Sequence, residues 1–124
     1  MGKIKEALNS LKKKNPGKYI KIEDWMVKGY GLQGNELIIY AIIHSFSRNG
    51  IDKFKGGSRY FRFWTGKSRP TIFRYIKSLL QKKVIYKTDK YIGPDMARHY
   101  CEYWTVLSRM DEKEQEKFIE ETSL

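Results

Sequence analysis

Eleven basic side chains lie between Lys53 and Lys87, and no Asp or Glu lies among them. A charged run is ordinarily a solvated surface, but a surface built for solubility alone mixes both signs of charge. The final segment, from Asp111 to Leu124, is different: six acidic and two basic side chains give it a net charge of −4. Residues 1–110 therefore carry +15, against +11 for the whole chain. This pattern predicts an anionic partner, and nucleic acid is the most direct candidate.

Other chemistry has weak support in the sequence. His99 and Cys101 alternate along an expected strand, but a zinc site needs about four ligands and no paired Cys or His spacing is present. Cys101 as a nucleophile would need an oriented base, and only His99 is near. His44 lies in an apolar stretch and is expected to be a core or partly buried residue. We therefore expect no enzyme activity, metal, cofactor or small-molecule substrate.

The composition indicates a folded domain. The chain has 124 residues, of which 40% are hydrophobic and 15% aromatic, enough for a core. The longest apolar run, Leu37 to Ile43, is far too short to span a bilayer. Charged residues interrupt any signal-peptide core at the start, and Cys101, the one cysteine, permits no internal disulfide. We expect a cytoplasmic protein without a membrane partner.

Hydrophobic periodicity and turn residues predict the elements that position the basic residues. Helices are expected at residues 3–14, 34–46 with a cap at Asn35, 58–65, 68–82 and 111–121. The run from Lys53 to Gly57 is expected to be a loop anchored by Phe54. Strands at residues 84–88 and 100–107 would form an antiparallel hairpin whose long polar tip is residues 89–99.

The helix expected from Ser68 to Lys82 separates an apolar stripe from a basic row. Ile72, Ile76 and Leu79 fall on one face, with Leu80 beside them. The opposite row is Arg69, Phe73 and Lys77, flanked by Pro70 and Arg74. Pro70 is tolerated because backbone N–H groups in the first turn of a helix have no hydrogen-bond partner within the helix, so the N–H that proline lacks is not needed there.

The stretch Trp64 to Ile72, together with Ile76, Leu79, Val84 and Ile85, resembles the winged helix-turn-helix pattern. The wider segment Ile22 to Lys87 is similar to the winged helices of plasmid and phage replication initiators and of DnaD-like N-terminal domains from Gram-positive bacteria. The chain departs from the family at Lys83, where a Gly is usual, and at Arg62, where a small residue is usual.

The resemblance implies a mainly α fold with a small antiparallel β-hairpin. Residues 19–107 would be the winged-helix domain, preceded by a basic helix and linker at 1–18 and followed by an acidic helix at 108–124. It further implies sequence-specific binding to double-stranded DNA, in replication initiation or transcription regulation of a mobile element. The implied contact residues are Lys53, Lys55, Arg59, Lys67, Ser68, Arg69, Pro70, Thr71, Phe73, Arg74, Lys77, Lys87, Lys90 and Arg98.

Two alternatives remain open at this point. The terminal helices could make the chain a protein-interaction or homodimerisation module. Trp25, Trp64 and Trp104 could stack on the bases of RNA or single-stranded DNA, although their apolar surroundings favour the core.

Overall fold

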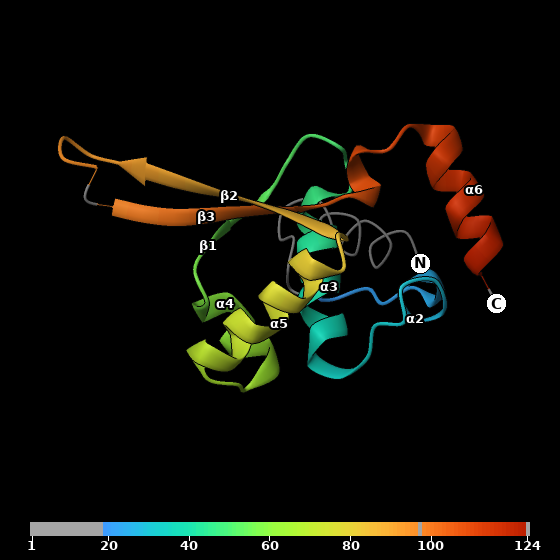
Figure 1. Ribbon diagram of the computed structural model, residues 1–124, viewed down its shortest axis with the longest axis horizontal. Helices are drawn as coiled ribbons and strands as arrows, with labels where there is room; N and C mark the ends of the chain where they lie inside the picture. Colours follow the sequence, from blue (N-terminus) through green and yellow to red (C-terminus); the bar gives the residue numbers. More distant parts are fainter. Residues whose placement is uncertain (1–18, 97, 124) are drawn as a thin grey trace, which may run out of the picture.

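The computed structural model describes residues 19–96 and 98–123, which form an α+β fold with five α-helices and one antiparallel sheet (Figure 1). The α+β class predicted from the sequence is therefore confirmed, while the helix expected at 3–14 lies outside the described residues. The helices are α2 (Asp24–Lys28), α3 (Gly34–Ser47), α4 (Arg59–Thr65), α5 (Arg69–Gln81) and α6 (Glu112–Thr122). The strands are β1 (Phe54–Gly56), β2 (Ile85–Ile92) and β3 (Arg98–Thr105), and a 3-10 turn, η1 (Leu107–Arg109), precedes α6.

Helix α3 is the centre of the core because it has almost no polar face. All five residues from Ile39 to Ile43 are buried, and α4, α5 and β3 pack around them. The helix begins at Gly34 after an extended Gln33, and no side chain caps it. The predicted cap at Asn35 is therefore wrong, since Asn35 lies inside the first turn.

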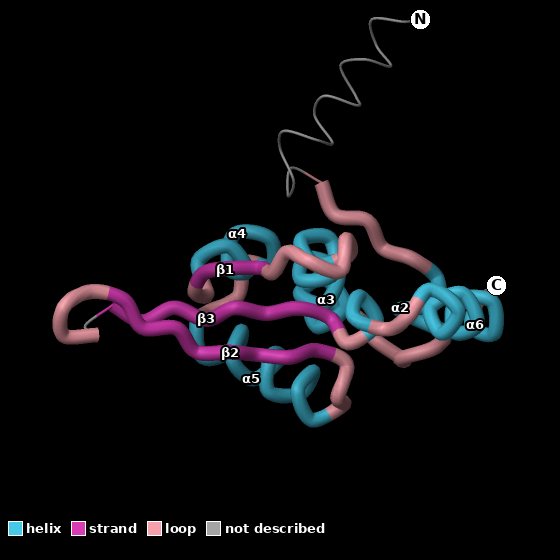
Figure 2. Tube along the Cα trace, turned by 90° about the horizontal axis from the view of Figure 1, so that it is seen from above, coloured by secondary structure: helices cyan, strands magenta, loops and turns pink. Residues whose placement is uncertain are grey.

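The sheet has three strands in the order β1-β3-β2, and helices α3, α4 and α5 lie on one of its faces (Figure 2). The prediction of a loop from Lys53 to Gly57 is wrong, because β1 pairs with β3 and places Phe54 opposite Tyr103. Phe54 is buried, with its ring 4.7 Å from that of Phe61. Anchoring by this one aromatic side chain holds the short strand on the sheet.

The β2–β3 hairpin is longer than the sequence suggests. Its register runs from Ile85 opposite Thr105 to Ile92 opposite Arg98. Residues 89–92 and 98–99, expected in the tip, are therefore strand, and the hairpin projects well beyond the helices (Figure 1). At the other end, β3 stops at Thr105 and Leu107 begins η1 instead of continuing the strand.

Helices α4 and α5 are joined by a tight turn at Gly66. Gly66 adopts φ 69°, and its N–H donates to the Arg62 carbonyl at 2.8 Å, which closes α4 with a left-handed cap. Ser58 and Ser68 occupy the N-cap positions predicted for them, but neither hydroxyl makes a capping bond to the helix backbone.

Helix α5 ends in a Schellman motif built on a lysine. Lys83 adopts φ 60°, its N–H donates to the Leu80 carbonyl at 3.0 Å, and the Val84 N–H donates to the Leu79 carbonyl at 3.3 Å. These two bonds define the motif, in which glycine usually holds the left-handed position. Lys83 therefore holds this left-handed position at a steric cost.

Helix α6 packs against α2 through aromatic contacts. The Phe118 ring lies 4.9 Å from Tyr30 and 5.9 Å from Trp25. The two helices approach closely at Gly29, where an added Cβ would lie 2.8 Å from both Phe118 Cζ and Thr122 Cγ2. Met110, Phe118 and Ile119 all pack against the core.

His44 is part of the same buried region, as the sequence predicts. Its Nδ1 lies 2.9 Å from Thr105 Oγ1, and its ring contacts Trp25 edge to face at 5.2 Å. Burial is the main cause that lowers the pKa of His44 to about 4, from an ordinary value of 6.5.

Candidate nucleic-acid interface

The outer face of α5 presents the predicted basic row to solvent. Ile72, Ile76 and Leu79 are buried against the core, so the residues between them point outward. The exposed residues of this face are Arg69, Pro70, Phe73, Arg74 and Lys77. Arg69 and Arg74 are not folded back into the core, and Phe73 is 37% exposed.

Short polar contacts organise the first turn of α5. The Ser68 and Thr71 hydroxyls lie 3.1 Å apart, and Arg74 Nη2 donates to Thr71 Oγ1 at 2.9 Å. The Arg69 guanidinium lies 5.3 Å from the centre of the Phe73 ring, within the range of a cation–π contact. Both arginines are thus held beside the amino end of the helix, where free backbone N–H groups also attract anions.

A cavity of about 300 Å³ separates the hairpin from the amino end of α5. Three guanidinium-bearing residues line it, namely Arg59 and Arg62 of α4 and Arg69 of α5. Its other lining residues are Gly56, Gly57, Ser58, Phe73, His99, Tyr100, Cys101 and Tyr103, so no acidic residue lines it. Three arginines in its lining make this arginine cavity suited to phosphate, and the carboxylate of Asp89 is bonded to the lining residues His99 and Cys101.

Arg62 belongs to this cavity although the sequence did not single it out as a contact residue. It stood out only as a departure from the family pattern, where a small residue is usual. The structure leaves its side chain exposed, so α4 accommodates it without burying charge. The sequence could have indicated Arg62 as a contact residue, because it belongs to the basic run from Lys53 to Lys87 that contains no acidic residue.

Lys53 and Lys55 lie apart from the arginine cavity, on the other face of the sheet. Lys53 Nζ is 3.9 Å from a carboxylate oxygen of Glu102 and 4.4 Å from the centre of the Trp104 ring. Lys55 is exposed and pairs in register with Glu102. Lys53 is therefore not gathered with Arg59, whereas Lys55 and Arg59 line a separate cavity together. Lys67 is exposed in the turn before α5.

The predicted hairpin contacts divide between its two faces. Lys87 is on the helix-facing side, with its ammonium 3.8 Å from Asp89 Oδ1. Lys90 and Arg98 are exposed on the opposite side, because they occupy the alternate positions of the register. The three residues therefore do not form a single patch.

The three tryptophans do not form a stacking surface. Trp25 is 2% exposed in the core, and Trp64 is partly buried against it. Trp104 is the exception to the expected core placement, since it lies on the outer face of the sheet, with its ring 5.5 Å from Tyr86.

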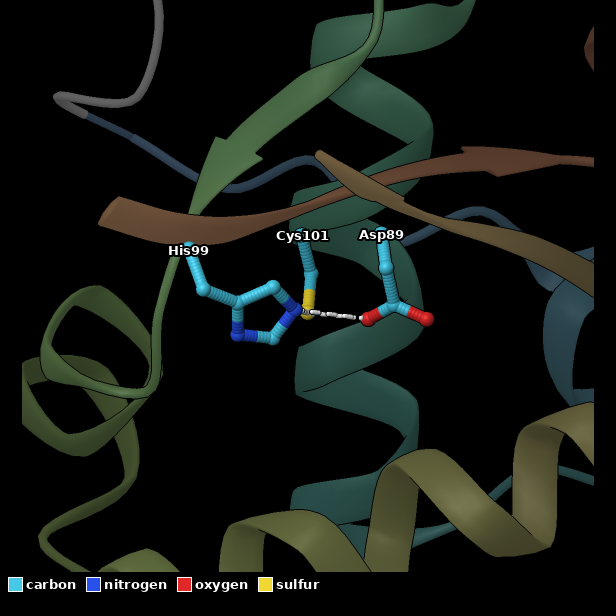
Figure 3. A group of neighbouring side chains, drawn as sticks. All are labelled: Asp89, His99 and Cys101. Carbon is cyan, nitrogen blue, oxygen red and sulfur yellow. Dashed lines mark hydrogen bonds and ion pairs between the residues drawn. The ribbon is translucent and has the colours of Figure 1, made fainter. Parts of the chain in front are cut away.

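Asp89, His99 and Cys101 meet on the helix-facing side of the hairpin (Figure 3). His99 Nε2 lies 2.9 Å from Asp89 Oδ1, and Cys101 Sγ lies 3.4 Å from the same oxygen. Hydrogen bonding from His99 and then Cys101 lowers the pKa of Asp89, while burial raises the pKa of Cys101. The sequence paired His99 with Cys101 but missed Asp89, because that residue was expected in the hairpin tip.

The acidic residues of α6 are remote from the basic face of α5. This helix lies at the end of the molecule opposite the hairpin tip, with α2 beside it (Figure 1). Its carboxylates are Glu112, Glu114, Glu116, Glu120 and Glu121. They therefore do not neutralise the arginine cavity.

Along residues 19–96 and 98–123, every helix is too short or too polar to cross a bilayer. Comparison of the chain with protein-family models, with curated proteins and with solved structures found no match.

Proposed function

We propose that this protein binds double-stranded DNA as a winged helix, with α4 and α5 as the helix-turn-helix and the β2–β3 hairpin as the wing. The observation that carries the proposal is the exposed basic face of α5 beside the arginine cavity, with no acidic side chain in either. A role in replication initiation or transcription regulation of a mobile element follows from the family resemblance of the sequence.

Helix α5 would enter the major groove, which is wide enough for one α-helix. The amino-terminal residues of such a helix reach the base edges. Arg69 and Arg74 occupy those positions, and an arginine can donate two hydrogen bonds to guanine. The exposed Phe73 would contact a thymine methyl group between them.

The arginine cavity would hold a backbone phosphate. Arg59, Arg62 and Arg69 approach it from two helices, so one phosphate can accept bonds from several guanidinium groups. Contacts to phosphate fix the register of the protein without reading sequence. Each lost phosphate contact should reduce the slope of log affinity against log salt by about 1.

The test compares Arg74→Ala with Lys113→Ala. Both variants lose one positive charge at an exposed position, but Lys113 is on the remote helix α6. A duplex selected from a random library would be labelled, and its affinity measured by fluorescence anisotropy at fixed salt. Arg74→Ala should weaken the selected site by about 1–3 kcal/mol and a scrambled duplex much less. Lys113→Ala should bind like the parent protein.

Equal weakening by the two variants would refute docking through α5, because it would reflect net charge alone. Unlabelled single-stranded DNA and RNA of the same length serve as competitors at the same salt. Displacement of the duplex by either one at lower concentration than by unlabelled duplex would refute the proposed substrate.

Dimerisation through the C-terminal helix α6 has less support than DNA binding. Phe118 and Ile119 of α6 are already packed against the core, and the helix is tied to α2 by Lys28 Nζ, which donates to the Ser123 carbonyl at 2.9 Å. Dimerisation through α6 would have to use its charged outer face, where two copies would repel each other.

A further inference from the structure

The hairpin places three different metal-ligating side chains on one face. Asp89 of β2 is directly opposite Cys101 of β3 in the register, and His99 precedes Cys101 by two residues. Residues two apart in a strand share a face, and directly paired residues do so as well. Figure 3 shows the carboxylate, imidazole and thiol pointing toward one another on the helix-facing side of the hairpin.

The separations of the three ligand atoms are close to those of a tetrahedral site. Bond lengths of about 2.0–2.3 Å to zinc imply edges of about 3.3–3.6 Å between ligands. The observed separations are 2.9 Å for Asp89 Oδ1 to His99 Nε2, 3.4 Å for Asp89 Oδ1 to Cys101 Sγ and 4.0 Å for Cys101 Sγ to His99 Nε2. Side-chain movements of about half an ångström or less would give all three bonds, without movement of the backbone.

We propose that Asp89, His99 and Cys101 form a binding site for a divalent transition metal of the zinc class. On binding, the Cys101 thiol loses its proton to solvent, and the thiolate and the Asp89 carboxylate together balance the two charges of the ion. Neutral His99 supplies the lone pair of Nε2. A thiolate and an imidazole select zinc or cobalt over magnesium and calcium, which prefer ligand sets made only of oxygen.

The surroundings leave the fourth position open. His99 and Cys101 line the arginine cavity, which has room for a water molecule or an anionic fourth ligand. Lys87, with its ammonium 3.8 Å from Asp89 Oδ1, must turn away when the ion binds. Its side chain is 33% exposed at the surface, so it can reach solvent without unfolding the strand.

Such a site would link side chains of the two strands in the projecting part of the hairpin. Beyond Asp89 and Cys101, the inner face of the hairpin carries only the stacked rings of Tyr91 and His99, with centroids 4.8 Å apart. A bound ion would therefore stabilise the projecting part of the hairpin in its folded register. The site borders the cavity proposed above for a DNA phosphate, but it does not need DNA and would exist in the free protein.

Cobalt titration of the reduced full-length chain tests the proposal directly. Cys101 is the one cysteine in the chain, so a thiolate-to-cobalt charge-transfer band can only come from this residue. We expect the band, together with the visible absorption of tetrahedral cobalt, to saturate at one equivalent. Addition of zinc should remove both signals by displacement.

Matched variants distinguish a built site from a lone thiol. Cys101→Ser should abolish the charge-transfer band, and His99→Gln and Asp89→Asn should each weaken cobalt binding by about 100-fold or more, since even outer-shell changes cost 10–100-fold. Asp95→Asn, which changes an exposed carboxylate in the hairpin tip, should bind cobalt like the parent protein. Circular dichroism would confirm that each variant is folded.

Two results would overturn the assignment. One is the absence of a charge-transfer band when cobalt is present at about a tenfold molar excess over the folded, reduced protein. The other is an unchanged affinity in both His99→Gln and Asp89→Asn, which would reduce the site to adventitious thiol binding.

Discussion

The buried imidazole of His44 should make the stability of this protein depend on pH in a defined direction. The His44 ring contacts the rings of Trp25 and Tyr40, and its Nδ1 is 2.9 Å from Thr105 Oγ1. Burial lowers its pKa to about 4, Glu23 opposes this shift, and Arg48 and Lys21 add to it. The folded protein therefore holds His44 neutral at pH values where an unfolded chain would protonate it.

The magnitude follows from the difference between the two pKa values. The unfolded chain binds a proton at His44 below pH 6.5, whereas the folded protein does so only below about pH 4. The unfolding free energy does not depend on His44 above pH 6.5. It falls as the pH decreases toward 4, because the unfolded state then binds a proton at His44 that the folded state does not. The pKa difference of about 2.5 units corresponds to a loss of about 3 kcal/mol over this range.

Urea unfolding of the parent protein and of His44→Gln, at a series of pH values from about 7 to 4, measures this loss. Glutamine keeps a polar group near Thr105 but does not titrate. The unfolding free energy of His44→Gln should therefore fall by about 3 kcal/mol less than that of the parent protein over this pH range. The buried Trp25 provides the fluorescence signal. Parallel pH profiles for the two proteins would refute the argument that burial keeps His44 neutral.

Two further predictions concern the backbone. Gly29→Ala should disturb both the end of α2 and its packing with α6, because the added Cβ would lie 2.7 Å from the Trp25 carbonyl oxygen and 2.8 Å from Phe118 Cζ; we expect a loss of about 1–3 kcal/mol and faster hydrogen exchange in α6. Gly57→Ala, whose Cβ meets nothing within 4 Å, is the control, and equal losses would contradict a steric cause. Lys83→Gly should raise the unfolding free energy by up to about 1 kcal/mol, since it removes the left-handed strain at φ 60°. Gln81→Gly, inside α5, should lower it by about 1 kcal/mol, and thermal unfolding that shows the same sign for both would contradict the Schellman assignment.

The helices were largely predictable because their signals are local. The apolar spacing of Ile72, Ile76 and Leu79 defines the buried side of α5, and Gly66 marks the turn before it. The exposure of Arg69 and Arg74 follows from this spacing. The basic side of the candidate interface could therefore be predicted from the sequence without a structure.

The strands were less predictable because pairing is not local. Phe54, Lys55 and Gly56 lack any alternating pattern, and their pairing with the distant strand β3 makes them a strand. Asp89 and Lys90 resemble turn residues, yet they continue β2 because β3 supplies their hydrogen-bond partners. For the same reason Asp89 could not be placed beside Cys101, twelve residues later, before the register was known.

The separation of acidic α6 from the basic helices α4 and α5 gives the described part of the molecule an electric dipole moment (Figure 1). In the field of a polyanion, such a molecule rotates during diffusion so that its positive end leads. The first collisions would then be productive more often than random orientation allows, which raises the association rate at low ionic strength. Counter-ions would cancel this torque beyond about 8–10 Å at physiological salt, so the acidic helix influences the speed of encounter more than the final affinity.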